Sequence, residues 1–266
     1  MQTYLGRDKV IADISVEDLK AHIDAEAKRG LSAKTLKTRQ QCIKRLFGFL
    51  LTEELIDKDP SQKLPDIRVP RKVSNPIPLD QIQRMLDYFD QSTPQGLRNK
   101  IIVLLLIDTG GRVSEIANIR TANIDIDRMR IKIVGKGNIE GFLNLSNSTR
   151  LLLLRYMRKI APPGQPIPTY LFESHRGKPI TRTAIAKMLR EVGHELGIPN
   201  VHAHRFRDTF ASEFAASSGD AFALQRELRH ADIQMSMRYV EQHSSSIQPK
   251  HEEHSPVANL IVNRRK

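Results

Sequence analysis

The chain has 266 residues, which suits one large domain or two ordinary ones, and its 39% of hydrophobic residues excludes an intrinsically disordered protein. Its 42 Lys and Arg residues against 30 Asp and Glu residues give a net charge of +12. This excess favours a polyanionic partner such as nucleic acid, although a basic protein without such a partner is an equal alternative. The single cysteine excludes an internal disulfide and a cysteine-based zinc finger.

The N-terminal part of the chain predicts two helices. Residues 1–13 carry charges and no sustained apolar stretch, so we expect no secretory signal and a protein of the reducing cytoplasm. Ser15 precedes an acidic first turn, which predicts a capped helix over residues 16–29. Ser32 opens a second predicted helix that runs to about Leu55, with apolar residues on one side and basic residues on the others. We expect residues 1–66 to form a helical domain.

Four prolines between residues 64 and 78 predict an extended linker over residues 67–78. A second domain is expected over residues 79–242, followed by a polar tail, residues 243–266. The longest apolar run, residues 101–107, is far too short to span a bilayer, so we expect no membrane contact.

The second domain is predicted to be mainly helical with a small antiparallel β-sheet. Alternating basic and apolar residues over 128–134 indicate a strand, and a glycine-rich turn leads to a second strand over 141–145. Helices are predicted from residue 79 and over residues 97–109, 147–160, 181–196, 205–217, 221–229 and 233–240.

Arg112 lies where one predicted helix ends at a glycine pair and another begins. Backbone N–H groups are free at such a junction, and an arginine there can make a bidentate contact with phosphate. Glu115 follows three residues later on the same side of the helix and can hold the guanidinium. Taken alone, this pattern more often marks an ordinary turn between two helices than a phosphate-binding site.

Lys136 occupies the tip of the predicted hairpin, between two glycines. A lysine beside a leaving oxygen can act as a general acid, although a lysine in a turn is usually only solvated.

His204 and Arg207 share one face at the start of a predicted helix, an arrangement that suits a phosphate or oxyanion site. A zinc site made by His202, His204 and His230 is a weaker alternative, because no cysteine and no recognised carboxylate spacing completes it.

Tyr239 follows His230 by nine residues. A tyrosine hydroxyl can attack phosphorus, and we expect nearby Arg and His residues to lower its pKa of about 10. Simple packing beside Met235 or Val240 is the alternative for this tyrosine taken alone.

Together these motifs resemble the tyrosine recombinase, or lambda-type integrase, family. The Thr-Gly-x-Arg-x-Ser-Glu motif stands at residues 109–115, the His-x-x-Arg motif at 204–207, and the Leu-x-His motif with its tyrosine at 228–239. The first domain is similar to the family's helical, SAM-like core-binding domain. Four positions depart from the usual pattern, none of them catalytic: Gly111, Phe206, Asp208 and Arg229.

The resemblance implies a site-specific DNA recombinase. Arg112 and Arg207 would hold the scissile phosphate, His204 and His230 would assist, and Lys136 would protonate the leaving oxygen. Tyr239 would form a 3′-phosphotyrosyl bond, with no cofactor, metal ion or ATP.

The resemblance also implies a partner and an assembly. The chain would bind double-stranded DNA at a specific site as a homotetramer, be a monomer when free, and associate with the chromosome. The tail, residues 243–266, would dock on a neighbouring protomer or fray. We expect a simple recombinase without an arm-binding domain.

Three alternatives remain. They are a type IB topoisomerase, a catalytically inert DNA-binding relative, and a metal-dependent hydrolase that uses histidines such as those of His251-Glu252-Glu253-His254.

Overall fold

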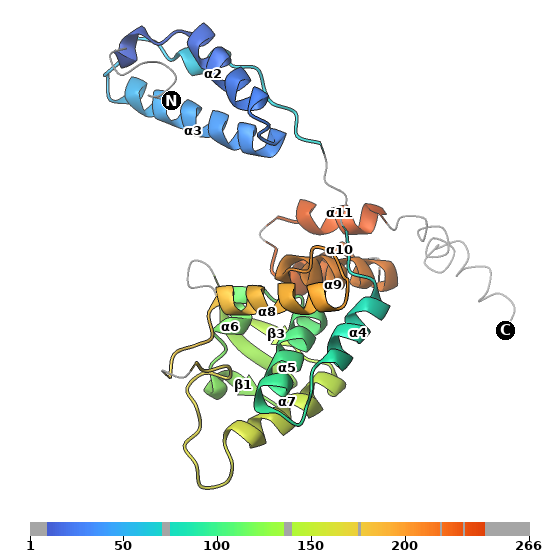
Figure 1. The fold of residues 1–266 in the computed structure, drawn as a ribbon. Coiled ribbons are helices and arrows are strands. Elements are labelled where there is room, and N and C mark those ends of the chain that lie inside the picture. Colours follow the sequence, from blue (N-terminus) through green and yellow to red (C-terminus); the bar gives the residue numbers. More distant parts are fainter. Residues whose placement is uncertain are drawn as a thin grey trace, which may run out of the picture. The chain divides into compact units, whose positions relative to one another are not determined.

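The computed structural model describes residues 10–70, 75–135, 140–174, 177–218, 220–230 and 232–242. The chain divides into two compact units, residues 1–73 and 74–266, each of which is described by itself below (Figure 1). Among the helices of these described ranges, none combines the length and the apolar composition that a bilayer-spanning helix requires.

The described part of the first unit contains two α-helices. They are α2, Val16–Lys28, and α3, Ala33–Thr52, accompanied by the short 3₁₀ helices η1, Ile11–Asp13, and η2, Pro60–Lys63. The predicted capping of α2 is confirmed, because Ser15 Oγ accepts from the backbone N–H of Asp18 while the Asp18 carboxylate accepts from the backbone N–H of Ser15. Leu19 of α2 and Phe47 of α3 are fully buried in the small core between the two helices.

The second unit is mainly helical. The α-helices in its described residues are α4, Leu79–Tyr88; α5, Pro94–Thr109; α6, Val113–Ala117; α7, Asn147–Ile160; α8, Arg182–Glu195; α9, Ala203–Ser218; α10, Ala221–Leu228; and α11, Gln234–Gln242. Helix α5 is apolar around most of its circumference, as expected for a helix covered on all sides. It packs against α4, α6, α7, α9 and strand β3, and so forms the centre of the main core.

The sheet of this unit is antiparallel, with strand order β1-β2-β3. The strands are β1, Ile124–Asp125; β2, Arg130–Val134; and β3, Glu140–Asn144. Ile131 pairs with Leu143, and both are fully buried, whereas the basic residues of β2 are more exposed. The predicted fold class is therefore confirmed. The two-residue strand β1 was not predicted, because it is too short to show an alternating pattern.

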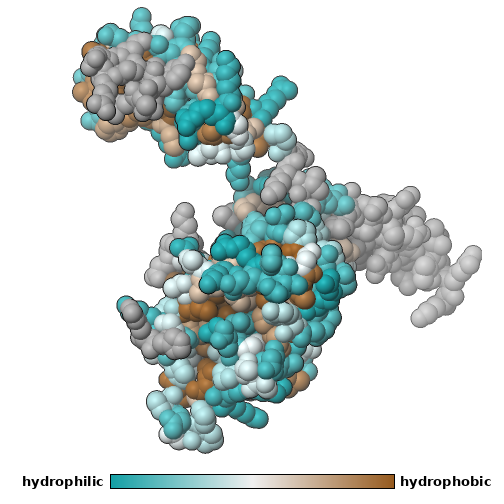
Figure 2. Space-filling model, viewed as in Figure 1, coloured by the Kyte–Doolittle hydropathy of each residue, from teal (hydrophilic) through white to brown (hydrophobic). Residues whose placement is uncertain are grey.

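Helices α9, α10 and α11 pack together around a second, smaller apolar cluster, formed by Ala211, Ala215, Leu224 and Leu228. The segment 75–77, which lies within the predicted linker, is bonded to α9. The backbone N–H of Ile77 donates to Thr209 Oγ1 at 2.8 Å, and Arg205 donates to the carbonyls of Asn75 and Pro76 at 3.0 and 3.1 Å. Hydrophilic side chains cover most of the face of this unit that Figure 2 shows, with smaller hydrophobic areas between them.

Candidate active site

Gly110 produces the turn that places Arg112. It follows α5 in the left-handed conformation, with a φ of 57°, and α6 begins at Val113. A Cβ atom on Gly110 would lie 2.6 Å from side-chain atoms of both Leu228 and Phe210. Glycine is therefore required here for two reasons: its backbone is left-handed, and α9 and α10 approach it too closely to leave room for a side chain. The turn between α5 and α6 therefore lies against α9 and α10.

Arg112 is held by Glu115 but remains accessible. Its Nη1 donates to Glu115 Oε1 at 2.9 Å, and its backbone N–H donates to Glu115 Oε2 at 2.8 Å. The arginine side chain is 46% exposed, whereas that of Glu115 is only 4% exposed. The carboxylate thus fixes the base of a guanidinium that still faces solvent, as the spacing of the two residues predicted.

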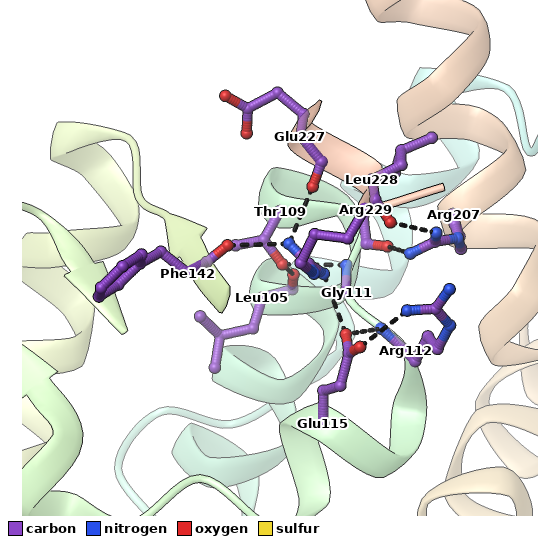
Figure 3. A network of polar contacts seen from close by, with 11 residues as sticks. Leu105, Thr109, Gly111, Arg112, Glu115, Phe142, Arg207, Glu227, Leu228 and Arg229 are labelled. Carbon is purple, nitrogen blue, oxygen red and sulfur yellow. Dashed lines mark hydrogen bonds and ion pairs between the residues drawn. The ribbon is translucent and has the colours of Figure 1, made fainter. Parts of the chain in front are cut away.

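A second arginine, Arg229, which the sequence marks only as a departure from the family pattern, completes this network. Arg229 donates from Nη2 to Glu115 Oε2 at 3.0 Å, and from Nη1 to the carbonyls of Phe142 and Glu227, both at 2.8 Å (Figure 3). It follows α10 in the left-handed conformation, with a φ of 53°, where glycine is usual. Arg229 therefore ties the end of α10 to strand β3 and to Glu115.

The pKa of Glu115 reflects this network. Burial raises the pKa, but the hydrogen bond from the Arg112 backbone and the charge of Arg229 outweigh burial, so the pKa lies below its ordinary value. Glu115 is therefore ionised throughout the neutral range.

Arg207 is buried, and its side chain donates to two main-chain carbonyls. Its Nη1 donates to the carbonyl of Gly110 at 2.7 Å and its Nη2 to the carbonyl of Leu228 at 2.6 Å. These carbonyls stand at the C-terminal ends of α5 and α10, where the helix dipoles are negative (Figure 3). Burial and the charge of Arg112 lower the pKa of Arg207 to about 10, so it stays protonated at neutral pH.

His230 is buried just after α10. Its Nδ1 lies 2.9 Å from Ser236 Oγ, and Ser236 is fully buried. Burial and the charges of Arg207 and Arg112 lower the pKa of His230 to about 4, so the imidazole is neutral at pH 7. Nothing in the sequence singled out Ser236, because a serine six residues from a histidine carries no recognisable pattern.

Tyr239 of α11 packs its ring against the α9–α10 cluster, and its hydroxyl donates to Asp208 Oδ1 at 2.8 Å. Burial and this hydrogen bond raise its pKa above the ordinary value, and the opposing charges of Arg207 and Arg238 are too small to reverse the shift. The expected net lowering of the Tyr239 pKa was therefore wrong, although the two arginines act in the expected direction. His204 lies at the same carboxylate: its Nε2 is 3.6 Å from Asp208 Oδ1, and its side chain is 71% exposed.

The structure brings most of the predicted site residues together. Arg112, Arg207, His230 and Tyr239 lie close enough for the charge of one to shift the pKa of another, and His204 joins them through Asp208. The predicted general acid, Lys136, lies outside the described residues, as does the His251-Glu252-Glu253-His254 segment. Within the described ranges, no three His, Cys, Asp or Glu residues are grouped so that they could hold a metal ion.

Comparisons with known proteins show the family to which the chain belongs. The model of the phage integrase family matches residues 76–245. The tyrosine recombinase XerC of Chromohalobacter salexigens is 28% identical over 232 residues, which cover 86% of this chain and 76% of the relative. XerC of Bacillus pumilus is 23% identical over 252 residues, with 92% and 83% coverage.

Two solved structures share the fold. The XerH site-specific recombinase bound to a palindromic difH substrate, in a post-cleavage complex, has a TM-score of 0.73 at 18% identity, with 91% of this chain and 73% of that chain covered. The Tn1549 transposon integrase in complex with a circular intermediate DNA has a TM-score of 0.70 at 20% identity, with 86% and 81% covered. Since the family model spans well over half of the 266 residues and covers every motif of the site, this chain belongs to the phage integrase family.

Proposed function

We propose that this member of the phage integrase family is a site-specific DNA recombinase that cuts and rejoins DNA strands through a covalent bond to Tyr239. One observation carries the proposal: two arginines, a neutral histidine and a tyrosine converge from the residue before α6, from α9, from the residues just after α10 and from α11. A phosphodiester is the substrate that needs both guanidinium groups and an oxygen nucleophile.

In this mechanism Arg112 and Arg207 hold the two non-bridging oxygens of the scissile phosphate. The neutral carbonyls of Gly110 and Leu228 hold Arg207, so its positive charge remains available to stabilise the transition state. Loss of one such preorganised donor typically costs about 100- to 1000-fold in rate. Arg112, which is anchored by Glu115 and partly exposed, is positioned to meet the incoming phosphate.

His204 and His230 hydrogen-bond to the phosphate and assist proton transfer, and Lys136 protonates the 5′ oxygen as it leaves. Attack by Tyr239 then gives a 3′-phosphotyrosyl bond and a free 5′ hydroxyl. The ester stores the energy of the broken bond, so religation requires no ATP. Because cationic side chains supply the charge stabilisation, we expect cleavage to persist in EDTA.

The DNA partner and the assembly follow from the same proposal. The solved structures of XerH and of the Tn1549 integrase, which share the fold, contain bound DNA. We infer that residues 79–242 are the catalytic domain, that residues 1–66 bind the DNA core site, and that the chain is a tetramer on DNA and a monomer when free. Strand exchange between two duplexes requires paired active sites, which a tetramer supplies. A cytoplasmic, chromosome-associated protein fits this role.

The experiment is capture of the covalent intermediate. The protein is incubated with a pool of nicked duplexes of randomised central sequence, and adducts that survive SDS are isolated, sequenced and mapped to the modified peptide. We expect the bond on Tyr239 and no adduct from Tyr239→Phe, with DNA binding retained. Tyr88→Phe, a half-exposed tyrosine outside the site, is the matched control.

An adduct formed by Tyr239→Phe would refute the assignment. Relaxation of supercoiled plasmids without sequence preference would favour a type IB topoisomerase instead.

A further inference from the structure

Asp208 contacts the nucleophile of the proposed reaction, and none of the motifs gave it a role. It follows Arg207 on α9, and its side chain is 18% exposed. Oδ1 of Asp208 accepts the hydrogen bond from the Tyr239 hydroxyl at 2.8 Å, and His204 Nε2 lies 3.6 Å from the same oxygen. The carboxylate thus stands between the phenol and an exposed imidazole.

This contact matters because the phenol must lose its proton to attack phosphorus. The pKa of Tyr239 is raised by burial and by the Asp208 hydrogen bond, so free phenolate is scarcer here than in water. Ionisation before attack is therefore disfavoured, and the proton has to pass to a base during the attack. A base must lie within hydrogen-bond reach of the proton that it removes, and Asp208 does.

We propose that Asp208 is a catalytic residue that accepts the proton of Tyr239 as the phenolic oxygen attacks phosphorus, and returns it on religation. The inference rests on the proposed function. The O–H bond of Tyr239 breaks while its oxygen bonds to phosphorus, and the proton moves to the Asp208 carboxylate. The P–O5′ bond breaks, and the leaving oxygen takes its proton from Lys136. In religation the 5′ hydroxyl attacks phosphorus while its proton returns to Lys136. The bond between phosphorus and the Tyr239 oxygen breaks, and the departing phenolate recovers its proton from Asp208.

The surrounding charges fit this role. Arg207 on α9 and Arg238 on α11 act on Tyr239 in the direction that favours phenolate. His204 is placed to stabilise the negative carboxylate before transfer or to relay the proton to solvent after it. The neutral His230, in the turn before α11, adds no charge at pH 7.

Asp208→Asn tests the proposal, because it keeps the shape and one acceptor oxygen while removing the base. Single-turnover adduct formation is measured on the nicked duplex that wild-type protein selects from the random pool. We expect a loss of about 100-fold or more, the typical contribution of general base catalysis, with DNA binding unchanged. Asp220→Asn, which alters the carboxylate that caps α10, is the matched control and should cleave at close to the wild-type rate.

Two readouts separate proton removal from mere positioning of the ring. Replacing Tyr239 by difluorotyrosine, whose phenol is more acidic, should restore much of the rate of Asp208→Asn while changing wild-type protein little. The rate of Asp208→Asn should also rise with pH more steeply than the wild-type rate. If Asp208→Asn does not fold, Asp208→Glu is tested in its place. This variant keeps a carboxylate in a displaced position, so adduct formation should be slower than in wild-type protein but should not depend more steeply on pH.

The outcomes distinguish the two proposals. A wild-type rate in Asp208→Asn, or a slow rate that neither acidic tyrosine nor high pH improves, overturns the role of Asp208 and leaves the recombinase function standing. An adduct formed by Tyr239→Phe, or no adduct from wild-type protein on any duplex of the pool, overturns the proposed function itself.

Discussion

Replacing Glu115 by glutamine should destabilise the second unit, because one carboxylate supports two arginines. It accepts three N–H bonds, two from Arg112 and one from Arg229, and its side chain is 4% exposed. Glutamine keeps one carbonyl oxygen, which in the place of Oε2 can still accept from the Arg112 backbone and from Arg229, although it no longer carries the negative charge. Its amide group then faces the Arg112 guanidinium and cannot accept from it.

The two ion pairs contribute unequally. Arg229 is 20% exposed, so leaving it without its anion costs about 2 to 3 kcal/mol, in the range for charged hydrogen bonds with buried groups. The Arg112 side chain is 46% exposed, so solvent screens its pair and its share is about 0 to 1 kcal/mol. We therefore expect Glu115→Gln to lower the free energy of unfolding by about 3 kcal/mol.

Urea unfolding measures this loss, and Asp125→Asn is the matched control. Asp125 also pairs with two arginines, Arg128 and Arg130, but at 3.6 and 3.7 Å and with a side chain that is 35% exposed. Asp125→Asn should therefore lower the free energy of unfolding by less than about 1 kcal/mol. The penalty for Glu115→Gln should be fully present at neutral pH and should shrink below pH 4.5, as the carboxylate is protonated. Equal, small losses in the two variants would refute the network as a source of stability.

Two further predictions concern neighbouring positions. Gly110→Ala should lower the free energy of unfolding by about 2 to 4 kcal/mol, because the left-handed backbone and the contacts with Leu228 and Phe210 both oppose a Cβ atom. Gly164→Ala, with a φ of 85° and open space around it, should cost only about 1 to 2 kcal/mol; equal losses on urea unfolding would contradict the close approach. The second of these positions is His230, whose pKa is 6.5 in the unfolded state and about 4 in the folded state. Because the unfolded state binds the proton first, the free energy of unfolding should fall by at most about 3 kcal/mol as the pH is lowered from 6.5 to 4. Unfolding curves of His230→Gln should lack that part of the pH dependence, and a pH dependence equal to that of wild-type protein would exclude a neutral buried imidazole.

Local patterns in the sequence predicted most of the fold. The helix over residues 147–160 has the predicted bounds, and the two longer strands lie within two residues of theirs, because capping residues and alternation are local signals. The second helix ends at Thr52 rather than near Leu55, since the apolar pattern continues past the last helical turn.

The site was only partly predictable. Order and spacing singled out residues such as Arg112, Arg207 and Tyr239. The contacts of Asp208 and Arg229 were not predictable, because their partners lie 31 and 114 residues away in the chain. For the same reason the predicted direction of the Tyr239 pKa shift was wrong. The sequence shows which residues are cationic, but it does not show that Tyr239 is buried or that it forms a long-range hydrogen bond.

The two carbonyls that hold Arg207 have a consequence for how the site tolerates sequence change. Every amino acid carries the same main-chain oxygen, so replacing the Leu228 side chain alters packing but removes neither acceptor. The position of the Arg207 guanidinium therefore depends on the residues at which α5 and α10 end. An insertion that extends either helix by one residue would displace the guanidinium more than most point substitutions nearby.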